Sequence, residues 1–456
     1  MKQATLIIAL MGAILLAGCG NGDTTSQSTF NNGSGDQPFK PTTHLSHRSV
    51  VTNYFAGQLQ VMDASQDRLT SFTFGVGSQP TYLQSSPDGT LTFVNNSGSN
   101  SISSLNNNLE SVKATIQLNG TTDSFVTSAN NKVGFAAVYN YSNGTFRTPG
   151  AIVRFNPTDG SLNTQIPFTG VRYISMDPAE KHLLAFTDGQ PDSSQAHWID
   201  LSIPDDPVTQ ASPVYLLTLA DSATGTPVLL SKPVDAFFSA DNTKAFILNC
   251  GTECGGSSAP SVIQVDLSTL VLDSTTRTGT AKVTNQWNSN NNVLGARRGL
   301  IDRTANKLYV AGSATTAISN DCPFTGSAPN CTTGKNIVQD GFFTTIDLAA
   351  GTASAPIRIG NGAKRWIRNI NGVFWVASTN CGVQSCITMV NPTAGTGTVL
   401  ATAKGDATGI SLAVNRGEVY TIEGGEFYMY DQKGNPLTSE HTTDVTGQAS
   451  DVLYIN

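Results

Sequence analysis

The sequence is poor in charged residues. Lys, Arg, Asp and Glu make up only 13% of its 456 residues, about half of the roughly 25% that is usual for soluble domains. The 26 basic residues are outnumbered by 33 acidic ones, which gives a net charge of -7. A protein that binds nucleic acid through its phosphates needs a basic surface. Nucleic acid is therefore not an expected partner.

The sequence also lacks the common motifs of catalytic and cofactor sites. It contains no GxSxG, GxxxxGK[ST], CxxC or CxxCH pattern, each of which supports a known chemistry at that spacing. Only five histidines are present, and none is expected at the binding face described below. No metal site and no cofactor are predicted, although calcium with oxygen ligands stays open because Asp and Asn are plentiful. An enzyme is less expected than a binding protein.

One long apolar run is present, and it lies at the beginning of the chain. It covers residues 6–17, follows Met1-Lys2 and ends at Gly18-Cys19. The run is too short for a stable membrane span, so residues 1–18 are predicted to be a signal peptide. Residues 16–19 (LAGC) resemble the lipobox of bacterial lipoproteins. This resemblance implies that Cys19 is acylated and anchors the protein in the cell envelope, while an ordinary secretory signal is the alternative.

The residues after Cys19 predict a tether and a single folded domain. Gly20 stands where the lipoprotein family has Asp in proteins retained in the inner membrane, so the resemblance favours the outer membrane or the cell surface. Residues 19–47 are rich in Gly, Ser, Asn and Thr, a composition typical of flexible linkers. Residues 48–456 are predicted to form one domain, which is expected to be monomeric.

The cysteines support export. Apart from Cys19, the six cysteines form three local pairs: Cys250 with Cys254, Cys322 with Cys331, and Cys381 with Cys386. Exported proteins fold in an oxidising compartment, so these pairs are predicted to be disulfides. Zinc is the alternative, but the spacings are not CxxC and no histidine lies near the pairs.

A repeated unit of two short strands separated by a polar turn runs along the chain. Taking one residue of the first strand as equivalent, the units are 42 to 66 residues apart. The equivalent residues are Val51, Phe93, Phe135, Leu183, Phe246, Tyr309, Trp375 and Tyr420. The second strand ends on Asp or Asn in all eight units, namely at Asp63, Asn106, Asn156, Asp200, Asp266, Asp347, Asn391 and Asp431. These side chains are predicted to cap turns by accepting from the backbone two residues on.

A further strand before and after each pair completes a four-stranded unit. Four antiparallel strands repeated around a ring form a β-propeller. Residues 51–54 (VTNY) and the turn at residues 86–90 (SPDGT) resemble the YVTN-repeat β-propeller family, mainly over residues 49–120. The fold class is therefore all-β, a propeller of four-stranded blades. Eight blades are favoured over seven, with the C-terminal residues 450–456 completing the blade that begins at Val50.

One face of this propeller is predicted to carry the function. The turn between the innermost strand and the next strand of each four-stranded unit is tight. Long segments lie at residues 140–150, 188–195, 250–260, 311–339 and 379–385. These loops and all three cysteine pairs would share one face, and long loops on a rigid scaffold often carry function. Seven residues are predicted to surround the channel mouth there and to bind an anionic group: Arg172, Lys232, Arg297, Arg298, Lys364, Arg365 and Trp366. The alternative is a solvated rim that Asp123, Asp406 and Asp451 neutralise.

Three functions fit these features. The first is a membrane-anchored lipoprotein that acts as a binding scaffold through its long-loop face. The second is a lactonase-like or lyase-like enzyme for an anionic small molecule or sugar, and the third is an accessory subunit of a periplasmic assembly. The family resemblance does not decide between them, because one fold supports many activities.

Overall fold

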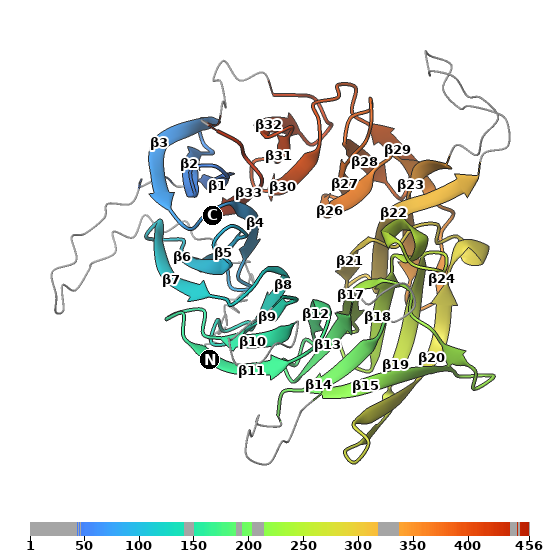
Figure 1. Ribbon diagram of the computed structural model, residues 1–456. Coiled ribbons are helices and arrows are strands. Elements are labelled where there is room, and N and C mark those ends of the chain that lie inside the picture. The colour runs from blue at the N-terminus through green and yellow to red at the C-terminus, as the bar shows by residue number, and fades with distance from the viewer. Residues whose placement is uncertain are drawn as a thin grey trace, which may run out of the picture.

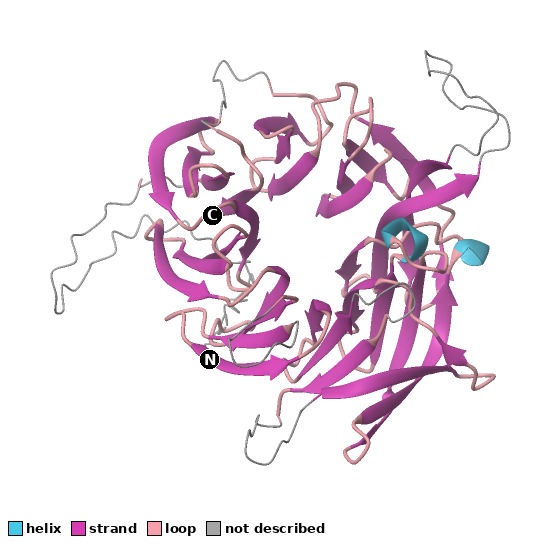
Figure 2. Ribbon diagram, in the orientation of Figure 1, coloured by secondary structure: helices cyan, strands magenta, loops and turns pink. Residues whose placement is uncertain are grey.

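A computed structural model describes residues 43, 45, 47–140, 150–187, 194–202, 214–317, 337–437, 445 and 447–455. The predicted leader, Cys19, nearly all of the tether and the Cys322/Cys331 pair lie outside these residues. Within them there is no α-helix, only strands and two short 3-10 helices, η1 (Gly251–Cys254) and η2 (Ser289–Asn291). Figure 2 shows the strands arranged as a ring, with the two helices on one side of it.

The described strands form eight blades around a central axis (Figure 1). From the axis outward, blade 1 contains β33 (Val452–Ile455), β1 (Arg48–Asn53), β2 (Gln58–Asp63) and β3 (Arg68–Gly75). Blade 2 contains β4 (Pro80–Ser85), β5 (Leu91–Asn96), β6 (Ser101–Asn106) and β7 (Ser111–Gln117). Blade 3 contains β8 (Thr122–Thr127), β9 (Gly134–Val138), β10 (Ala151–Phe155) and β11 (Leu162–Pro167). Blade 4 contains β12 (Val171–Met176), β13 (His182–Thr187), β14 (Ala196–Asp200), β15 (Val214–Asp221) and the short β16 (Pro227–Val228).

The second half of the ring is less regular. Blade 5 contains β17 (Pro233–Phe238), β18 (Lys244–Asn249), β19 (Ser261–Asp273) and β20 (Thr278–Trp287). Blade 6 contains β21 (Arg298–Asp302), β22 (Lys307–Ala317), β23 (Ile337–Asp347), β24 (Thr352–Ala353) and β25 (Ile357–Ile359). Blade 7 contains β26 (Ala363–Ile370), β27 (Val373–Thr379), β28 (Ile387–Asn391) and β29 (Thr396–Val399). Blade 8 contains β30 (Ala407–Ala413), β31 (Glu418–Glu423) and β32 (Glu426–Asp431).

The C-terminal strand closes the ring, as the sequence predicts. Strand β33 pairs with β1 in antiparallel orientation, with Arg48 opposite Ile455 and Val51 opposite Val452. The Thr52 N–H extends this pairing by donating to the Asp451 carbonyl over 3.0 Å. Eight innermost strands therefore surround the axis, and the chain ends hold the ring together.

Burial along the strands explains why each blade has its sequence pattern. The second strands are covered on both sides by neighbouring blades, so every residue of β5 is buried. The outer strands are covered on one side only, and β7 accordingly alternates between exposed and buried positions over its last five residues. Side chains of a strand alternate between two faces, which makes this difference readable from sequence.

The predicted turn-capping role of the repeated Asp and Asn residues is confirmed. The side-chain oxygen of each accepts a backbone N–H two or three residues further on, in all eight units. The four strands of a blade are numbered from the axis outward, so the repeated Asp and Asn residues lie at the ends of the third strands. Because consecutive strands are antiparallel, these turns lie on the same side of the ring as the turns between first and second strands. We call this side the turn face. The opposite side, where second strands connect to third strands and one blade connects to the next, is the mouth face.

Blades 4 and 5 depart from a regular propeller because their outer strands join. Strand β15 pairs in parallel with β20 from Leu216 opposite Thr278 to Asp221 opposite Val283. The two blades therefore form one continuous sheet, and an apolar cluster that includes Phe186, Trp198 and Phe238 fills the space between them. Among the described strands, no other two neighbouring blades have outer strands that pair with each other.

Candidate binding site in the central channel

The entry of most innermost strands contains a β-bulge. Six of these strands show a register shift within their first residues. The residue that the shift leaves unpaired is Thr81, Asp123, Arg172, Val234, Arg365 or Thr408. A bulge turns its side chain away from the regular ladder. Five of these six residues are polar, so the bulges place polar groups at the mouth face of the channel, while Val234 is apolar and buried.

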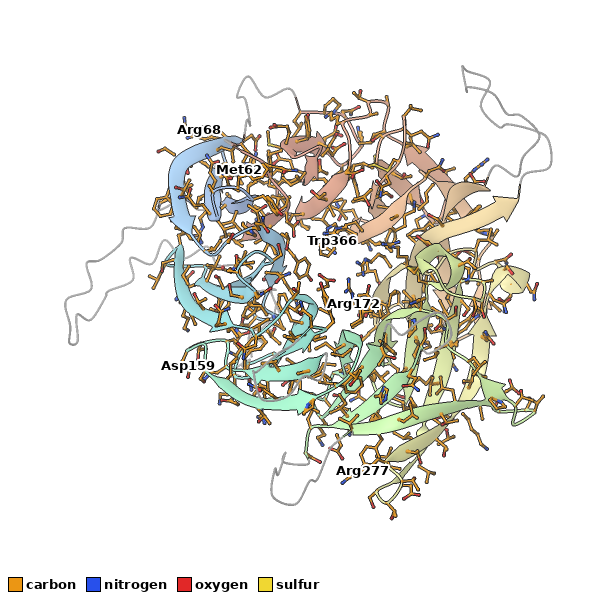
Figure 3. All side chains as sticks on the ribbon, viewed as in Figure 1. Met62, Arg68, Asp159, Arg172, Arg277 and Trp366 are labelled. Atoms are coloured by element: carbon orange, nitrogen blue, oxygen red, sulfur yellow. A yellow bond between two sulfur atoms is a disulfide. The ribbon has the colours of Figure 1, made fainter. Side chains whose placement is uncertain are left out.

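Arg172 lies near the centre of the ring (Figure 3). Its guanidinium pairs with the Asp123 carboxylate over 2.5 Å, and the guanidinium carbon lies 4.3 Å from the centre of the Tyr139 ring. Burial lowers the pKa of Arg172, but the charge of Asp123 and contacts with tyrosines more than offset this, so that the pKa is raised overall. Part of the predicted basic rim is thus neutralised by an acid from the adjacent blade.

Arg297 faces a buried acid from a disulfide-closed loop. The Cys250–Cys254 disulfide closes the loop that contains η1, and Glu253 of this loop accepts the Ser313 N–H over 2.7 Å. The Arg297 guanidinium lies 3.9 Å from the other Glu253 oxygen. Burial raises the pKa of Glu253, although the hydrogen bond and the nearby cations oppose this. This loop therefore brings a carboxylate to the basic residues of blade 6.

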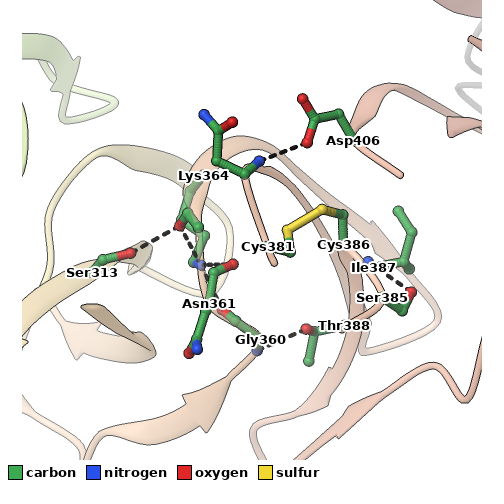
Figure 4. Close-up of a disulfide and its surroundings, with 12 residues drawn as sticks. Ser313, Gly360, Asn361, Lys364, Cys381, Ser385, Cys386, Ile387, Thr388 and Asp406 are labelled. Atoms are coloured by element: carbon green, nitrogen blue, oxygen red, sulfur yellow. Dashed lines mark hydrogen bonds between the residues drawn. A yellow bond between two sulfur atoms is a disulfide. The ribbon is translucent and has the colours of Figure 1, made fainter. Parts of the chain in front are cut away.

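Lys364 is buried and has a structural environment. Its ammonium donates to the carbonyls of Gly360, Asn361 and Gly362 over 2.6, 3.1 and 2.8 Å (Figure 4). Burial lowers its pKa to about 8. All three carbonyls accept hydrogen bonds from its ammonium group, so Lys364 stabilises the loop that leads into blade 7.

The other described disulfide, Cys381–Cys386, lies beside this loop (Figure 4). It closes the connection between β27 and β28, while Cys250–Cys254 lies in the connection between β18 and β19. Both connections join second to third strands and therefore lie on the mouth face. Two of the three predicted disulfides and their common face are confirmed.

Lys232 lies next to the first of these loops. Its backbone carbonyl accepts the Cys250 N–H over 3.0 Å, and its N–H donates to the Ser194 hydroxyl over 3.0 Å. Its side chain is half-buried. The structure thus places Lys232 beside the Cys250–Cys254 loop, at the entry of β17.

Three arginines of blades 6 and 7 form the part of the cluster that lacks acidic partners. Among the described residues, no ion pair joins Arg298, Arg365 or Arg368 to a carboxylate. The Nε atom of Arg298 is buried and makes no hydrogen bond to the described protein. Burial lowers the pKa values of Arg365 and Arg368, and repulsion by Arg298 contributes to both shifts. Arg298 therefore repels both of the other cations, of which Arg365 is exposed and Arg368 is half-buried.

An aromatic pair lies across the channel next to these arginines. Tyr82 of blade 2 and Trp366 of blade 7 stack at 5.3 Å with an interplanar angle of 5°, although blades 8 and 1 lie between their own blades. The indole N–H of Trp366 donates to the Thr408 carbonyl over 2.8 Å, and Arg368 lies 4.5 Å from the indole ring centre. Trp366 appears near the axis in Figure 3. The stacked pair thus links blades 2 and 7 and lies against Arg368.

Two acids, the buried Asp451 and the half-buried Asp235, lie within electrostatic range of the arginines. Asp451 accepts the Leu83 N–H over 2.7 Å and the Val452 N–H over 2.9 Å, which links blade 1 to blade 2. Burial raises its pKa to about 7. Burial also raises the pKa of Asp235, which Arg298 opposes. Both carboxyls bind a neighbouring strand, so their negative charge is only partly available to balance the arginines.

Arg368, Asp235, Glu253 and Tyr82 are site residues that the sequence interpretation omits. Side chains alternate along a strand, so Arg368 follows from Trp366 by counting two positions along β26. Asp235 and Tyr82 occupy the same inward column as Trp366 in their own blades. Glu253 had no comparable signal, because its position depends on how the disulfide loop folds over blade 6. Asp406, a predicted balancing acid, instead accepts the Asn380 N–H over 2.6 Å.

The described residues contain no group of three or more His, Cys, Asp or Glu side chains that could hold a metal ion. The described part of the chain also has no helix of the length and apolarity that crossing a membrane requires. His182 lies on the turn face, where its ring pairs with Asp177 over 3.0 Å. His197 packs against Phe168, and burial lowers its pKa to about 4.

Comparison with known proteins supports the fold. No protein-family model matches the sequence, and no curated protein does so either. Dihydro-heme d1 dehydrogenase NirN, solved in complex with DHE, superposes with a TM-score of 0.54 at 13% identity, over 92% of this chain and 77% of its own. Apo AztD from Citrobacter koseri superposes with a TM-score of 0.51 at 10% identity, over 90% of this chain and 97% of its own. At these identities the similarity shows the propeller fold alone.

Proposed function

We propose that this protein binds an anionic ligand at the mouth of its central channel. The observation that carries the proposal is the set of three arginines, Arg298, Arg365 and Arg368, which have no acidic partner among the described residues. A carboxylate, phosphate or sulfate group would relieve their mutual repulsion and accept hydrogen bonds from the unpartnered Nε of Arg298. Hydrogen bonds between oppositely charged groups are stronger than those between neutral groups. A guanidinium group can also donate two parallel hydrogen bonds to such an anion.

The surrounding structure favours binding over catalysis. Disulfides fix two of the loops beside the channel, and the described histidines lie away from it on the turn face or on outer strands. A cluster of arginines beside a stacked aromatic pair is an arrangement that can recognise anionic sugars or small acidic molecules. It also suits an acidic segment of a partner protein, which agrees with a scaffold role.

The proposal includes attachment to the cell envelope through Cys19. It rests on the lipobox-like sequence at residues 16–19 and is compatible with where the described chain begins. Glu110 lies in the turn between the third and fourth strands of blade 2. Its carboxylate accepts from the Thr43 hydroxyl over 2.5 Å and pairs with the Arg48 guanidinium over 3.0 Å. The chain thus enters the ring at the turn face. A lipid anchor on that side would leave the channel mouth facing away from the membrane, at the outer membrane or cell surface.

The binding proposal is tested with a triple variant, Arg298→Gln/Arg365→Gln/Arg368→Gln, in a soluble chain that begins at Gly20 and therefore lacks Cys19. Calorimetry with a sulfated disaccharide, a uronate disaccharide and a neutral disaccharide gives the affinities. Each charged hydrogen bond is worth about 1.5 to 3 kcal/mol, so the variant should lose anion affinity by roughly a hundredfold or more. Product analysis of the same samples separates binding from turnover.

A matched control removes the same charge elsewhere. Arg68, Lys113 and Arg154 are exposed on blades 1, 2 and 3, and their replacement by Gln should leave the affinity nearly unchanged. Equal losses in both triple variants would show that net charge, and not the channel, attracts the anion, and the proposal would be wrong.

The anchoring proposal has its own measurement. In cells, the unmodified protein should fractionate with membranes and carry a mass increase from acyl chains. The Cys19→Ala variant should lose both. Membrane association that persists in this variant would contradict a lipid anchor at Cys19.

A further inference from the structure

A cavity lies on the turn face, away from the central channel, where blades 4 and 5 join. Its volume is about 400 Å³, within the range of roughly 300 to 1,000 Å³ that small-molecule sites occupy. Three leucines of β19 line it, namely Leu267, Leu270 and Leu272, together with Trp198 of β14. The cavity is the open end of the apolar space between the two blades.

The leucines reach the cavity because β19 contains a large bulge. Asp266 lies opposite Lys282, but Val271 lies opposite Thr280, so β19 uses more residues than its partner strand. Thr269 closes the bulge by donating to the Asp266 carbonyl over 2.6 Å and accepting the Lys282 N–H over 2.9 Å. The bulge is thus an ordered feature that adds an apolar wall which a regular blade would not have.

The opposite wall carries an oriented histidine. The His182 ring stacks on Trp198 at 4.5 Å, and its Nδ1 lies 3.0 Å from the Asp177 carboxylate. Burial opposes ionisation of Asp177, but hydrogen bonds from His182 and two backbone N–H groups keep its pKa below the usual value. An ionised Asp177 requires Nδ1 to be the donor. In the neutral ring, Nε2 is then an acceptor.

Asn242 and Asp200 add acceptors to the polar side of the cavity, which also includes Lys181. Asn242 lines it, and the Oδ1 atom of Asn242 is buried without a hydrogen-bond partner among the described residues. The Asp200 carboxylate also lines it, using its Oδ1 to cap the turn at Ser202. A buried acceptor without a donor costs free energy, so the Asn242 Oδ1 atom favours an occupant that donates hydrogen bonds.

We propose that the cavity binds a small aromatic molecule whose ring carries hydroxyl or amino donors. The ring would lie between the leucines of β19 and the stacked His182 and Trp198. Its donors would reach His182, Asn242 or Asp200. The site is separate from the channel, because it is built from turn-face residues of blades 4 and 5 and needs none of the arginines.

The test uses two probes of nearly equal shape, a dihydroxynaphthalene and the corresponding dimethylnaphthalene, with a soluble chain that begins at Gly20. Ligand-observed NMR titration measures both affinities. The dihydroxy compound should bind at least roughly tenfold more tightly, the effect of one satisfied hydrogen bond of about 1.4 kcal/mol. Equal affinities would overturn the assignment of a donor-bearing ligand.

Substitutions then locate the site. Leu270→Arg should abolish binding by filling the cavity, whereas Val271→Arg changes the adjacent residue, which is 66% exposed and does not line the cavity, and should bind normally. Equal binding by these two variants would overturn the proposal. If Leu270→Arg fails to fold, as judged by its circular dichroism and melting temperature, His182→Phe keeps the ring and removes the acceptor. That variant should lose the preference for the dihydroxy probe, and an unchanged preference would exclude His182 as the acceptor.

Discussion

The two faces of the propeller use the same kinds of polar residue in different ways. On the turn face, the repeated Asp and Asn side chains bind the backbone of their own turns. On the mouth face, charged side chains reach across blades: Arg172 pairs with Asp123, and Asp451 binds the Leu83 N–H. Local partners make the turns repetitive, although on this face too Arg48 of blade 1 pairs with Glu110 of blade 2. Long-range partners make the mouth face irregular, and there three arginines are left without an acid.

Repetition along the chain indicates a structural role. A residue that recurs in every blade serves what every blade needs, which is a turn. A residue that occurs in only one or two blades, such as Arg298 or Glu253, has no counterpart that explains it as part of the repeat. Such residues are the better candidates for binding. Lys364 shows, however, that a charged residue without counterparts in the other blades can also have a structural role.

Lys364→Met should cause the largest loss of stability. The substitution keeps the length of the side chain but leaves the carbonyls of Gly360, Asn361 and Gly362 without their donor. Unsatisfied buried groups cost about 1 to 3 kcal/mol each, so the free energy of unfolding should fall by about 3 kcal/mol. Urea denaturation measures it, and Lys113→Met, at an exposed position of β7, is the control. Similar values for both variants would show that the mouth face does not depend on this lysine.

Asp347→Ala on the turn face should have a smaller and purely structural effect. The Asp347 carboxylate accepts the N–H groups of Ala349 and Ala350 over 3.0 and 2.9 Å. Loss of such a cap costs about 1 kcal/mol, and anion affinity should not change because the turn lies opposite the channel mouth. Asp347→Asn keeps an acceptor, as three other units do, and should be nearly neutral. A change in anion affinity in the Ala variant would contradict the separation of the two faces.

The smallest expected effect is a pH dependence of anion binding. Burial raises the pKa of Asp451 to about 7, so this carboxyl is mostly protonated at pH 6 and mostly ionised at pH 8. Its negative charge then offsets Arg365 and Arg368 and should weaken binding by roughly threefold. Lys364, with a pKa of about 8, acts in the same direction at higher pH.

The measurement uses a sulfated disaccharide, whose charge is constant over this range, in calorimetric titrations from pH 6 to pH 7.5. Asp451→Asn should flatten the profile. Binding that strengthens as the pH rises would have the wrong sign and would exclude Asp451 as the titrating group. A flat profile in the unmodified protein would do the same.

Much of the fold follows from the sequence because it depends on local signals. The strands alternate or are fully apolar, the turns have Asp, Asn and Gly at fixed places, and the last strand has the pattern of an innermost strand. Eight blades, ring closure and two disulfides could therefore be predicted. The joining of blades 4 and 5 could not, since the pairing of β15 with β20 depends on contacts between residues about 60 positions apart.

The candidate binding site was predicted less completely, for the same reason. The bulge column at the strand entries placed Arg172 and Arg365 near the channel, as expected from the repeat. The sequence did not distinguish Lys364, whose donors are occupied, from Arg298, whose Nε has no partner. Both are cations at the start of an innermost strand or near it, and only the position of neighbouring carbonyls separates their roles.

The sequence by itself determined the repeat, the turn caps, the closing strand and the cysteine pairs, because each of these depends on residues that are close along the chain or that recur at a fixed place in it. The tertiary structure decided which charges meet across the channel and which cavity forms where two blades join. Electrostatic and packing energies depend on distance in space, and a closed ring brings together strands from opposite ends of the chain.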